Sequence, residues 1–318
     1  PTRLMESLAT GVGHRAVVYS NMVLTGTIFN CSGGSVPEGW ISCEETDDPG
    51  HGYAFLTRIG DDTLVDPAHR RIEPWGRLKR EGVSVDAERG IVYMTEDHAS
   101  GCLYRFVPED PDRPMGAGRL EALAVRGIVD TDPKFPLAEG STWATEWVVV
   151  DDPSATKEPC RAQAQQVGAS RFNRCEGSVL DRSKLWFIAS TAGPVGAGQV
   201  FCLDTASGAL TLAVQVEDRS VLSMPDNLTL SPWGDLIMTE DNYNTGGGAT
   251  HQHIRGLRPD GTIYDFARNP HREEDDCGAE ITGPCFSPDG RFLFVNLQHP
   301  IGATVAIHGP WPRVLGSA

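Results

Sequence analysis

The residues of this chain with the clearest chemical potential are carboxylates that recur at fixed places in a repeated segment. Single acids open three copies of the segment and stand just before a fourth: Glu81, Glu176, Asp226 and Glu280. Adjacent acids close three copies: Glu44-Glu45, Glu96-Asp97 and Glu240-Asp241. Where a copy has both, the pair begins fourteen or fifteen positions after the single acid. Cys31 stands fourteen positions before Glu45, in the place that other copies give to a single acid.

The distance of fourteen or fifteen positions between opening and closing acids is the length of one β-hairpin. Each segment has a short apolar strand, a turn and a second apolar strand, and the two strands of a hairpin run antiparallel. The start of the first strand and the end of the second therefore lie at the same edge. If the hairpins surround a common channel, up to ten carboxylates and the Cys31 thiol meet at one mouth.

Acids gathered in this way repel one another unless cations neutralise them. Carboxylate and amide oxygens suit calcium, and a thiolate among carboxylates suits a transition metal such as iron. We therefore predict a metal centre with the following candidate ligands: Cys31, Glu44, Glu45, Glu81, Glu96, Asp97, Glu176, Asp226, Asn227, Glu240, Asp241 and Glu280. The alternative is that these acids are turn and edge residues that face water. The coincidence of opening and closing acids in the same copies favours the metal centre.

Two arginines accompany the acids. Arg174 stands two positions before Glu176, and Arg255 follows the third hairpin. A guanidinium beside metal-bound carboxylates can bind a phosphate through two parallel hydrogen bonds. We predict catalytic and substrate-binding roles for both arginines, with an ion pair to a surface acid as the alternative for each.

Short strands must position these side chains, because sustained helical periodicity is hard to find, the best short candidate being 162–167. Four segments share the hairpin layout and a fifth is a weaker copy: 81–97, 176–190, 226–241, 283–296 and 30–45. Repeated hairpins at such intervals are typical of an all-β fold of the β-propeller kind. A long β-sandwich is the alternative fold.

Charge and cysteine usage exclude several classes of protein. Acidic residues outnumber basic ones by 43 to 27, and the net charge of −16 argues against nucleic acid or an anionic membrane as partner. No run of eighteen apolar residues is present, so we expect no membrane span. The eight cysteines include no CxxC pair, which excludes zinc ribbons and thioredoxin-like sites.

Motifs along the chain resemble the PhoX-type alkaline phosphatases and their shorter relatives, from about residue 24 to residue 311. The motifs that carry the resemblance are Asn30-Cys-Ser-Gly-Gly, Trp40-Ile-Ser-Cys-Glu-Glu-Thr, Trp75-Gly-Arg-Leu-Lys-Arg-Glu, Gly90-Ile-Val-Tyr-Met-Thr-Glu-Asp, Arg171-Phe-Asn-Arg-Cys-Glu, Pro225-Asp-Asn-Leu, Gly283-Pro-Cys-Phe-Ser-Pro-Asp-Gly-Arg-Phe-Leu-Phe-Val-Asn-Leu-Gln-His-Pro and Ala306-Ile-His-Gly-Pro-Trp. The family usually has Ser-His before the glutamate that Glu81 matches, whereas Lys79 and Arg80 stand there in this chain.

The resemblance implies one propeller domain over residues 1–318, six-bladed, with an iron–calcium cluster at its channel mouth. Since only about thirty residues precede Cys31, the N-terminal blade is incomplete or unusual, or formed by a partner. The resemblance assigns Cys31, Glu81 and Glu176 to iron and Arg174 to phosphate. The candidates for calcium or iron are Glu44 or Glu45, Asp226, Asn227 and Glu280.

The leading functional hypothesis is a metal-dependent phosphatase or phosphodiesterase that acts on a small-molecule phosphate ester. The resemblance implies export to the periplasm or the outside of the cell, and no signal peptide lies within this numbering. A calcium-dependent propeller lactonase is the first alternative and would need no thiol ligand. A binding propeller that metals stabilise, without chemistry, is the second.

Overall fold

The computed structural model describes residues 3–7, 14–127, 137–242, 251–270, 279–298, 302–309 and 311, with side chains from residue 20 onward. In this part of the chain, 22 strands and one short α-helix make up the regular structure, together with the 3-10 turns η1 (Pro67–His69) and η2 (Glu73–Trp75). The helix, α1 (Cys160–Gln166), covers most of the predicted helical segment 162–167. No helix among the described residues is long and apolar enough to cross a membrane.

The strands form five antiparallel units, which we number in chain order. Unit 1 contains β3 (Asn30–Val36), β4 (Gly39–Glu44), β5 (Ala54–Arg58) and β6 (Arg71–Ile72). Unit 2 contains β7 (Arg80–Asp86), β8 (Ile91–Glu96), β9 (Leu103–Pro108) and β10 (Gly118–Val125). Unit 3 contains β12 (Cys175–Asp181), β13 (Lys184–Ala189), β14 (Gln199–Asp204) and β15 (Ala209–Gln215).

Unit 4 contains β16 (Pro225–Leu230), β17 (Leu236–Glu240), β18 (His253–Leu257) and β19 (Ile263–Arg268). Unit 5 contains β20 (Ile281–Phe286), β21 (Phe292–Leu297) and β22 (Ala303–His308). Strand β11 (Thr142–Val149) pairs with β10 and with β15, so it joins units 2 and 3 into one nine-stranded sheet. Strands β1 (Arg3–Ser7) and β2 (His14–Tyr19) form a separate hairpin.

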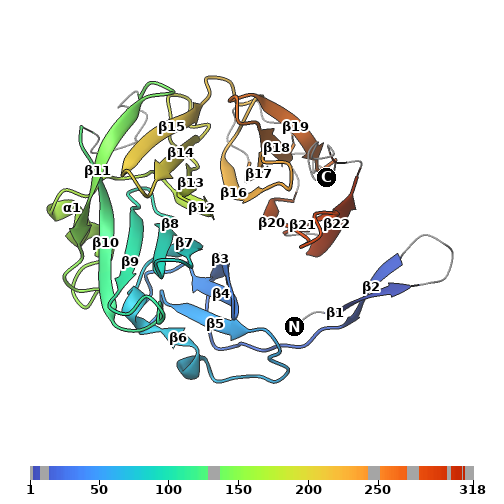
Figure 1. Ribbon diagram of the computed structural model, residues 1–318, viewed down its shortest axis with the longest axis horizontal. Helices are drawn as coiled ribbons and strands as arrows, with labels where there is room; N and C mark the ends of the chain where they lie inside the picture. Colours follow the sequence, from blue (N-terminus) through green and yellow to red (C-terminus); the bar gives the residue numbers. More distant parts are fainter. Residues whose placement is uncertain are drawn as a thin grey trace.

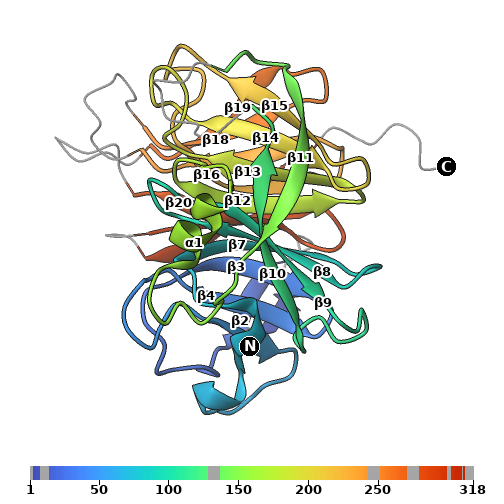
Figure 2. The ribbon, with the colours of Figure 1, turned by 90° about the vertical axis from the view of Figure 1, so that its left-hand side faces the viewer.

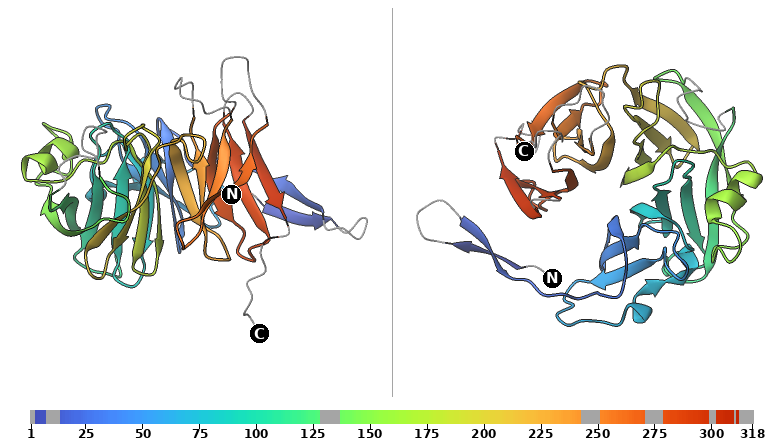
Figure 3. Two further views of the ribbon diagram at one scale, coloured as in Figure 1. Left: turned by 90° about the horizontal axis from the view of Figure 1, so that it is seen from above. Right: turned by 180° about the vertical axis from the view of Figure 1, so that it is seen from behind.

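The units follow one another around a common centre, with the first strand of each unit innermost (Figure 1). Turned by 90°, the molecule shows α1 outside the ring, beside β10 (Figure 2). Seen from behind, the ring is open between unit 5 and unit 1, on the side where the β1–β2 hairpin extends (Figure 3). The five predicted hairpin segments correspond to the two inner strands of the five units.

Four apolar clusters hold the units together, each built by two successive units. Alternation along the strands explains how one strand serves two clusters, because neighbouring side chains point to opposite faces of a sheet. On β13, Phe187 packs between units 2 and 3, whereas Ile188 packs between units 3 and 4. On β17, Met238 faces unit 3 and Ile237 faces unit 5. This packing brings the inner strands side by side around the centre.

Candidate metal centre

The inner hairpin of every unit carries the same irregularity near its start: two residues of the first strand stand opposite one residue of the second. The paired residues of the first strands are Cys31-Ser32, Glu81-Gly82, Glu176-Gly177, Asp226-Asn227 and Gly283-Pro284. A β-bulge of this kind turns a side chain away from the direction that regular pleating would give it. The first bulge residue is a possible metal ligand in units 1 to 4.

These side chains meet at the centre of the ring. Three sets of possible ligand atoms each lie within 4.8 Å of one another: Cys31 with Glu45 and Glu81, Glu81 with Glu176 and Asp226, and Asp226 with Asp241 and Glu280. Because Glu81 and Asp226 are shared, the sets join into one group, which we call the acidic cluster: Cys31, Glu45, Glu81, Glu176, Asp226, Asp241 and Glu280. All five units contribute to it.

Backbone hydrogen bonds hold the second acid of each adjacent pair at this mouth. The amide N–H groups of Glu45, Asp97 and Asp241 donate to the carbonyl of the residue that precedes the first strand of the same unit, at 2.9, 3.0 and 2.9 Å. Glu45 and Asp241 belong to the acidic cluster. Asp97 lies beside the cluster, bound to Arg174 and Lys79.

The first acid of each pair is the last residue of its strand and is buried with partners of its own. Glu44 accepts hydrogen bonds from the Gly52 amide and the His51 ring, both at 2.8 Å. Glu96 accepts from the Tyr104 hydroxyl at 2.7 Å and from Arg161 at 2.8 Å.

Glu240 accepts from Arg255 at 2.8 Å and from the Ser223 amide at 2.9 Å. The structure therefore does not bring Glu44, Glu96 or Glu240 into the cluster. They are buried instead against partners in loops and neighbouring strands.

The two predicted arginines have different positions. Arg174 is 22% exposed, and its guanidinium contacts Glu176 at 2.7 Å and Asp97 at 2.9 Å. Its backbone has a left-handed φ of 52°, as have Phe29 and Met224, which also stand immediately before an inner strand. Arg255 is buried among Glu240, Asp265 and the Ser220 carbonyl. The structure thus brings Arg174, but not Arg255, to the acidic cluster.

Lys79 is a further cation at the mouth that sequence reasoning did not select. Its ammonium contacts a Glu45 oxygen at 2.6 Å and an Asp97 oxygen at 3.3 Å. A signal was present in the sequence, because Lys79 stands two positions before Glu81, as Arg174 stands two positions before Glu176.

The carboxyl groups of the cluster have strongly shifted acidities. Burial, assisted by the negative charge of Asp241, raises the pKa of Asp226 to about 8 and that of Glu280 to about 9. Burial and the charge of Asp226 raise the pKa values of Glu81 and Glu176 well above the ordinary range. These directions describe buried acids that lack sufficient positive charge around them.

The pKa values of the Cys31 thiol and of Asp97 are shifted in opposite directions. Burial and the charge of Glu81 raise the pKa of the Cys31 thiol. Burial also acts to raise the pKa of Asp97, but the hydrogen bond and charge of Arg174 lower it to about 2. Among these buried acids, Asp97 is the one whose contacts with Arg174 and Lys79 outweigh the effect of burial.

The cluster fits a bound cation. Glu81 is only 1% exposed, and its Oε2 atom has no hydrogen-bond partner among the described residues. A buried carboxylate oxygen without a partner is costly, and a cation would satisfy it. The donors are carboxylate oxygens and one sulfur, a set that suits calcium together with a transition metal.

Asn227 contacts two acids of the cluster. Its side-chain nitrogen lies 3.5 Å from Glu81 Oε1 and also donates to Asp226, while its oxygen accepts the Gly283 amide at 2.8 Å. In this arrangement the amide oxygen bridges units 4 and 5. The side chain orients two acids of the cluster.

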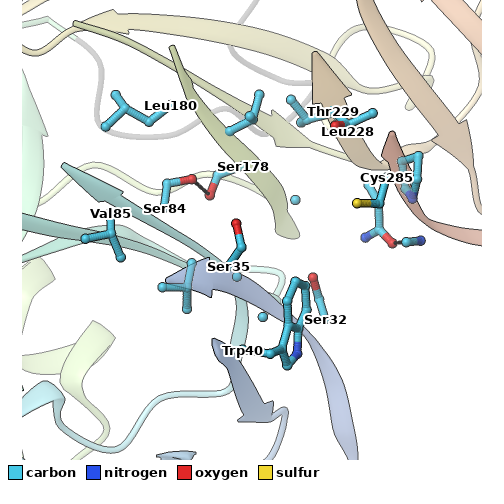
Figure 4. A pocket seen from close by; sticks show the side chains of 18 residues that line it. Ser32, Ser35, Trp40, Ser84, Val85, Ser178, Leu180, Leu228, Thr229 and Cys285 are labelled. Carbon is cyan, nitrogen blue, oxygen red and sulfur yellow. Dashed lines mark hydrogen bonds between the residues drawn. The ribbon is translucent and has the colours of Figure 1, made fainter. Parts of the chain in front are cut away.

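A cavity of about 270 Å³ adjoins the cluster at Asn227 and continues between the inner strands. Figure 4 shows a mixed lining, in which Ser84 and Ser178 face each other at 3.0 Å and the apolar side chains of Val85 and Leu180 lie beside them.

The cysteines other than Cys31 lie outside the cluster in the described residues and are free, as Cys31 is. Cys43 and Cys175 are fully buried in apolar clusters, and Cys285 borders the cavity. Cys277 is outside the described residues.

Comparisons with known proteins agree with the motifs. The family model for alkaline phosphatase PhoX matches residues 10–301. The solved structure of Pseudomonas fluorescens PhoX, in complex with vanadate as a transition-state analogue, has a TM-score of 0.64 and 20% sequence identity. The match covers 90% of this chain and 66% of that one, so this chain spans just under two thirds of that protein. At this identity the likeness concerns the fold alone.

A gluconolactonase from Xanthomonas campestris is also similar, with a TM-score of 0.46, 13% identity and coverage of 89% of this chain and 72% of that one. A TM-score at that level supports no argument about function. No curated protein matches the sequence.

Proposed function

The chain belongs to the PhoX alkaline phosphatase family, and on that basis we propose that it is a metal-dependent phosphoric-ester hydrolase with an iron–calcium centre at the acidic cluster. The observation that carries this proposal is the acidic cluster itself, in which seven possible ligands from five units form three overlapping sets and one of them, Glu81, has a buried oxygen without a partner among the described residues. A thiol within 4.8 Å of Glu45 and Glu81 favours iron as one of the metals, because a calcium-dependent lactonase would need no thiol ligand.

Cys31, Glu45 and Glu81 form the set that suits iron, with Glu176 adjacent to it, and Asp226, Asp241 and Glu280 form the set that suits calcium. Bound cations would supply Lewis acidity, which neutralises charge on a phosphoryl group and activates an oxygen nucleophile. Arg174 is fixed by Asp97 and Glu176 with part of its side chain exposed. A guanidinium held in this way is preorganised to bind phosphoryl oxygens, and we propose Arg174 as the substrate-binding residue.

The family also bears on the architecture of the whole chain. We propose that residues 1–318 form one β-propeller domain of six blades, of which units 1 to 5 are five, and that the sixth completes the ring on the side of the β1–β2 hairpin. The substrate would be a small-molecule phosphate ester, and the family suggests an exported protein.

Elemental analysis and a hydrolysis assay test the function. The chain is purified after expression with iron and calcium supplied and is assayed on a nitrophenyl phosphate monoester and diester. We expect both metals in the protein and hydrolysis of at least one ester. Protein that binds neither metal after reconstitution would overturn the proposed metal centre. Protein that binds both metals without hydrolysing either ester would show that the metal centre is structural and would overturn the hydrolase.

A pair of cysteine variants tests the iron ligand. Cys31→Ala is expected to lower the iron content, because it removes the thiol from the cluster. Cys202→Ala is the matched control, since Cys202 lies on β14 of unit 3, away from the acidic cluster. Equal iron content in the two variants would remove Cys31 from the ligand set.

A further inference from the structure

One of three equivalent acids at the mouth is kept out of the acidic cluster. Glu45, Asp97 and Asp241 occupy the same structural position, defined by the same backbone hydrogen bond to the residue before an inner strand. Glu45 and Asp241 each belong to a set of possible metal ligands, whereas Asp97 belongs to no such set among the described residues. The difference lies in what surrounds Asp97.

Two protein cations surround the Asp97 carboxylate. Arg174 contacts one oxygen at 2.9 Å and the other at 3.2 Å, and the Lys79 ammonium lies 3.3 Å from the second oxygen. Lys79 also contacts Glu45 at 2.6 Å, so a single positive charge bridges units 1 and 2 at the mouth. At the corresponding position in unit 4, Asp241 lies instead within a set with Asp226 and Glu280.

The backbone holds Lys79 in this position from both sides. Its carbonyl accepts the Asp97 amide at 3.0 Å, and Lys79 forms an isolated antiparallel bridge with Glu45. The side chain is only 29% exposed. An ammonium fixed between two carboxylates neutralises charge as a bound cation does, and it leaves no ligand position open.

We propose that the Lys79 ammonium takes the place of a divalent cation between Glu45 and Asp97, and so sets how many metal ions the centre holds. The inference rests on the proposed metal centre. Removing the ammonium leaves Glu45 and Asp97 without the cation between them, although Arg174 still contacts Asp97. The two carboxylates come from adjacent units and are oxygen donors of the kind that bind Ca²⁺. Lys79 is thus a specificity-determining residue for metal number, and a small neutral residue in its place creates a new calcium site.

Counting bound calcium tests this proposal directly. Equilibrium dialysis with Ca²⁺ is expected to show about one more ion per chain for Lys79→Ser than for the unaltered chain, and the gain is expected to vanish in Lys79→Ser/Asp97→Asn. Lys184→Ser is the matched control, because Lys184 also pairs with an aspartate, Asp204 at 2.8 Å, but lies at the start of β13, at the end of the inner hairpin of unit 3 opposite the acidic cluster. A folded Lys79→Ser protein that binds no extra calcium overturns the proposal.

A second comparison does not need the lysine variant to fold. In the otherwise unaltered chain, Asp97→Asn is expected to leave the calcium count unchanged, whereas Asp241→Asn is expected to lower it. A lower count in Asp97→Asn would make Asp97 a ligand already and would contradict the proposal. If the unaltered chain binds no divalent cation at all, the proposed metal centre fails instead, so the two failures are distinguishable.

Discussion

Glu240 and Asp241 are neighbours in the chain with different surroundings. Glu240 is fully buried and accepts hydrogen bonds from Arg255, His253 and the Ser223 amide. Asp241 lies within ligand distance of Asp226 and Glu280. The two side chains point to opposite sides of the strand end, as neighbouring residues do on a strand. One acid therefore supports the fold and the other faces the proposed metals.

This difference predicts opposite results for two single substitutions. Glu240→Gln is expected to lower the free energy of unfolding by about 3 kcal/mol, because it removes the buried charge that pairs with the Arg255 guanidinium and leaves the exposed Asp265 as its ionic partner. The metal content of the folded protein should not change. Asp241→Asn is expected to lower the metal content with little loss of stability in the metal-free protein. Urea unfolding and elemental analysis of both variants measure these effects, and a metal loss in Glu240→Gln would contradict the division of roles.

The shifted acidities of the cluster predict how the metal-free protein responds to pH. Asp226 and Glu280 have pKa values near 8 and 9 in the fold, whereas carboxyl groups in an unfolded chain titrate near pH 4. Between those limits the folded state binds more protons than the unfolded state, so stability falls as pH rises. We expect the urea midpoint of metal-free protein to decrease from pH 5 to pH 9.

Bound metals should weaken or remove this dependence, because they displace the protons. The control is the same series of measurements with iron and calcium restored. A metal-free protein that becomes more stable as pH rises through this window would show that the cluster acids are ionised without metals.

At the residue scale, sequence spacing indicates which segments carry ligands but not which of two adjacent acids faces inward. The orientation depends on the bulge and on the strand register, and both are set by pairing with the second strand. Lys79 illustrates the same limit. Its sequence position is visible, but its bridging of Glu45 and Asp97 depends on two units that pack against each other.

The inner strand with its bulge is the element on which the site depends. Gly177, the second bulge residue of unit 3, allows close approach to the next inner strand. A Cβ atom there would lie 2.6 Å from the Asp226 carbonyl oxygen and 2.9 Å from the Asn227 Cα. Both contacts are with backbone, so no side-chain movement can relieve them.

Gly177→Ala is therefore expected to push β12 and β16 apart. We predict a loss of about 1–3 kcal/mol in stability, as for other overpacked sites, together with weaker metal binding. Gly116→Ala is the control, because Gly116 lies in the loop between β9 and β10, away from the cluster, and its substitution should cost less than about 0.5 kcal/mol. Urea unfolding and a calcium titration measure both effects, and equal behaviour of the two variants would contradict the role given to Gly177.

At the element scale, the inner hairpins could be predicted because each is a local repeat with its own turn. The pairing of strand β11, in contrast, could not be predicted from local sequence patterns. Its residues are strand-like in the sequence, yet its pairing with β10 on one side and β15 on the other joins two units. That pairing depends on segments that are distant in the chain.

At the scale of the whole molecule, apolar clusters join successive units, and all five units contribute to the acidic cluster. The apolar clusters link neighbours only. Cations at the mouth would link units that do not pack against each other, because Cys31 is in unit 1 and Glu280 immediately precedes unit 5. Metal binding is therefore expected to stabilise the whole ring.

Removal of the metals should lower the melting temperature in a single transition. Free metal at one hundred times its dissociation constant would contribute about 2.7 kcal/mol of stability. Calorimetry before and after treatment with a chelator measures the change, and restoring calcium and iron should reverse it. An unchanged melting temperature in protein that has lost its metals would show that the ring does not depend on them.

At this scale, the sequence predicted hairpins around a channel, and the structure arranges the units around a common centre. Among the described residues the ring is open between unit 5 and unit 1 (Figure 3). Closure of a ring depends on pairing between distant segments, which the hairpin repeat does not specify.

The bulges also have a consequence for how such a protein can evolve. Cys31, Glu81, Glu176, Asp226 and Gly283 occupy one structural position in five units. Four of these residues are possible metal ligands, and Gly283 has no donor side chain. If the proposed metal centre holds, one substitution at this position would exchange a soft donor for a hard one, or remove it, while the rest of the scaffold stays the same. The choice of metal would then be inherited separately from the architecture, and a lineage with this fold would pass from one inorganic chemistry to another by single substitutions.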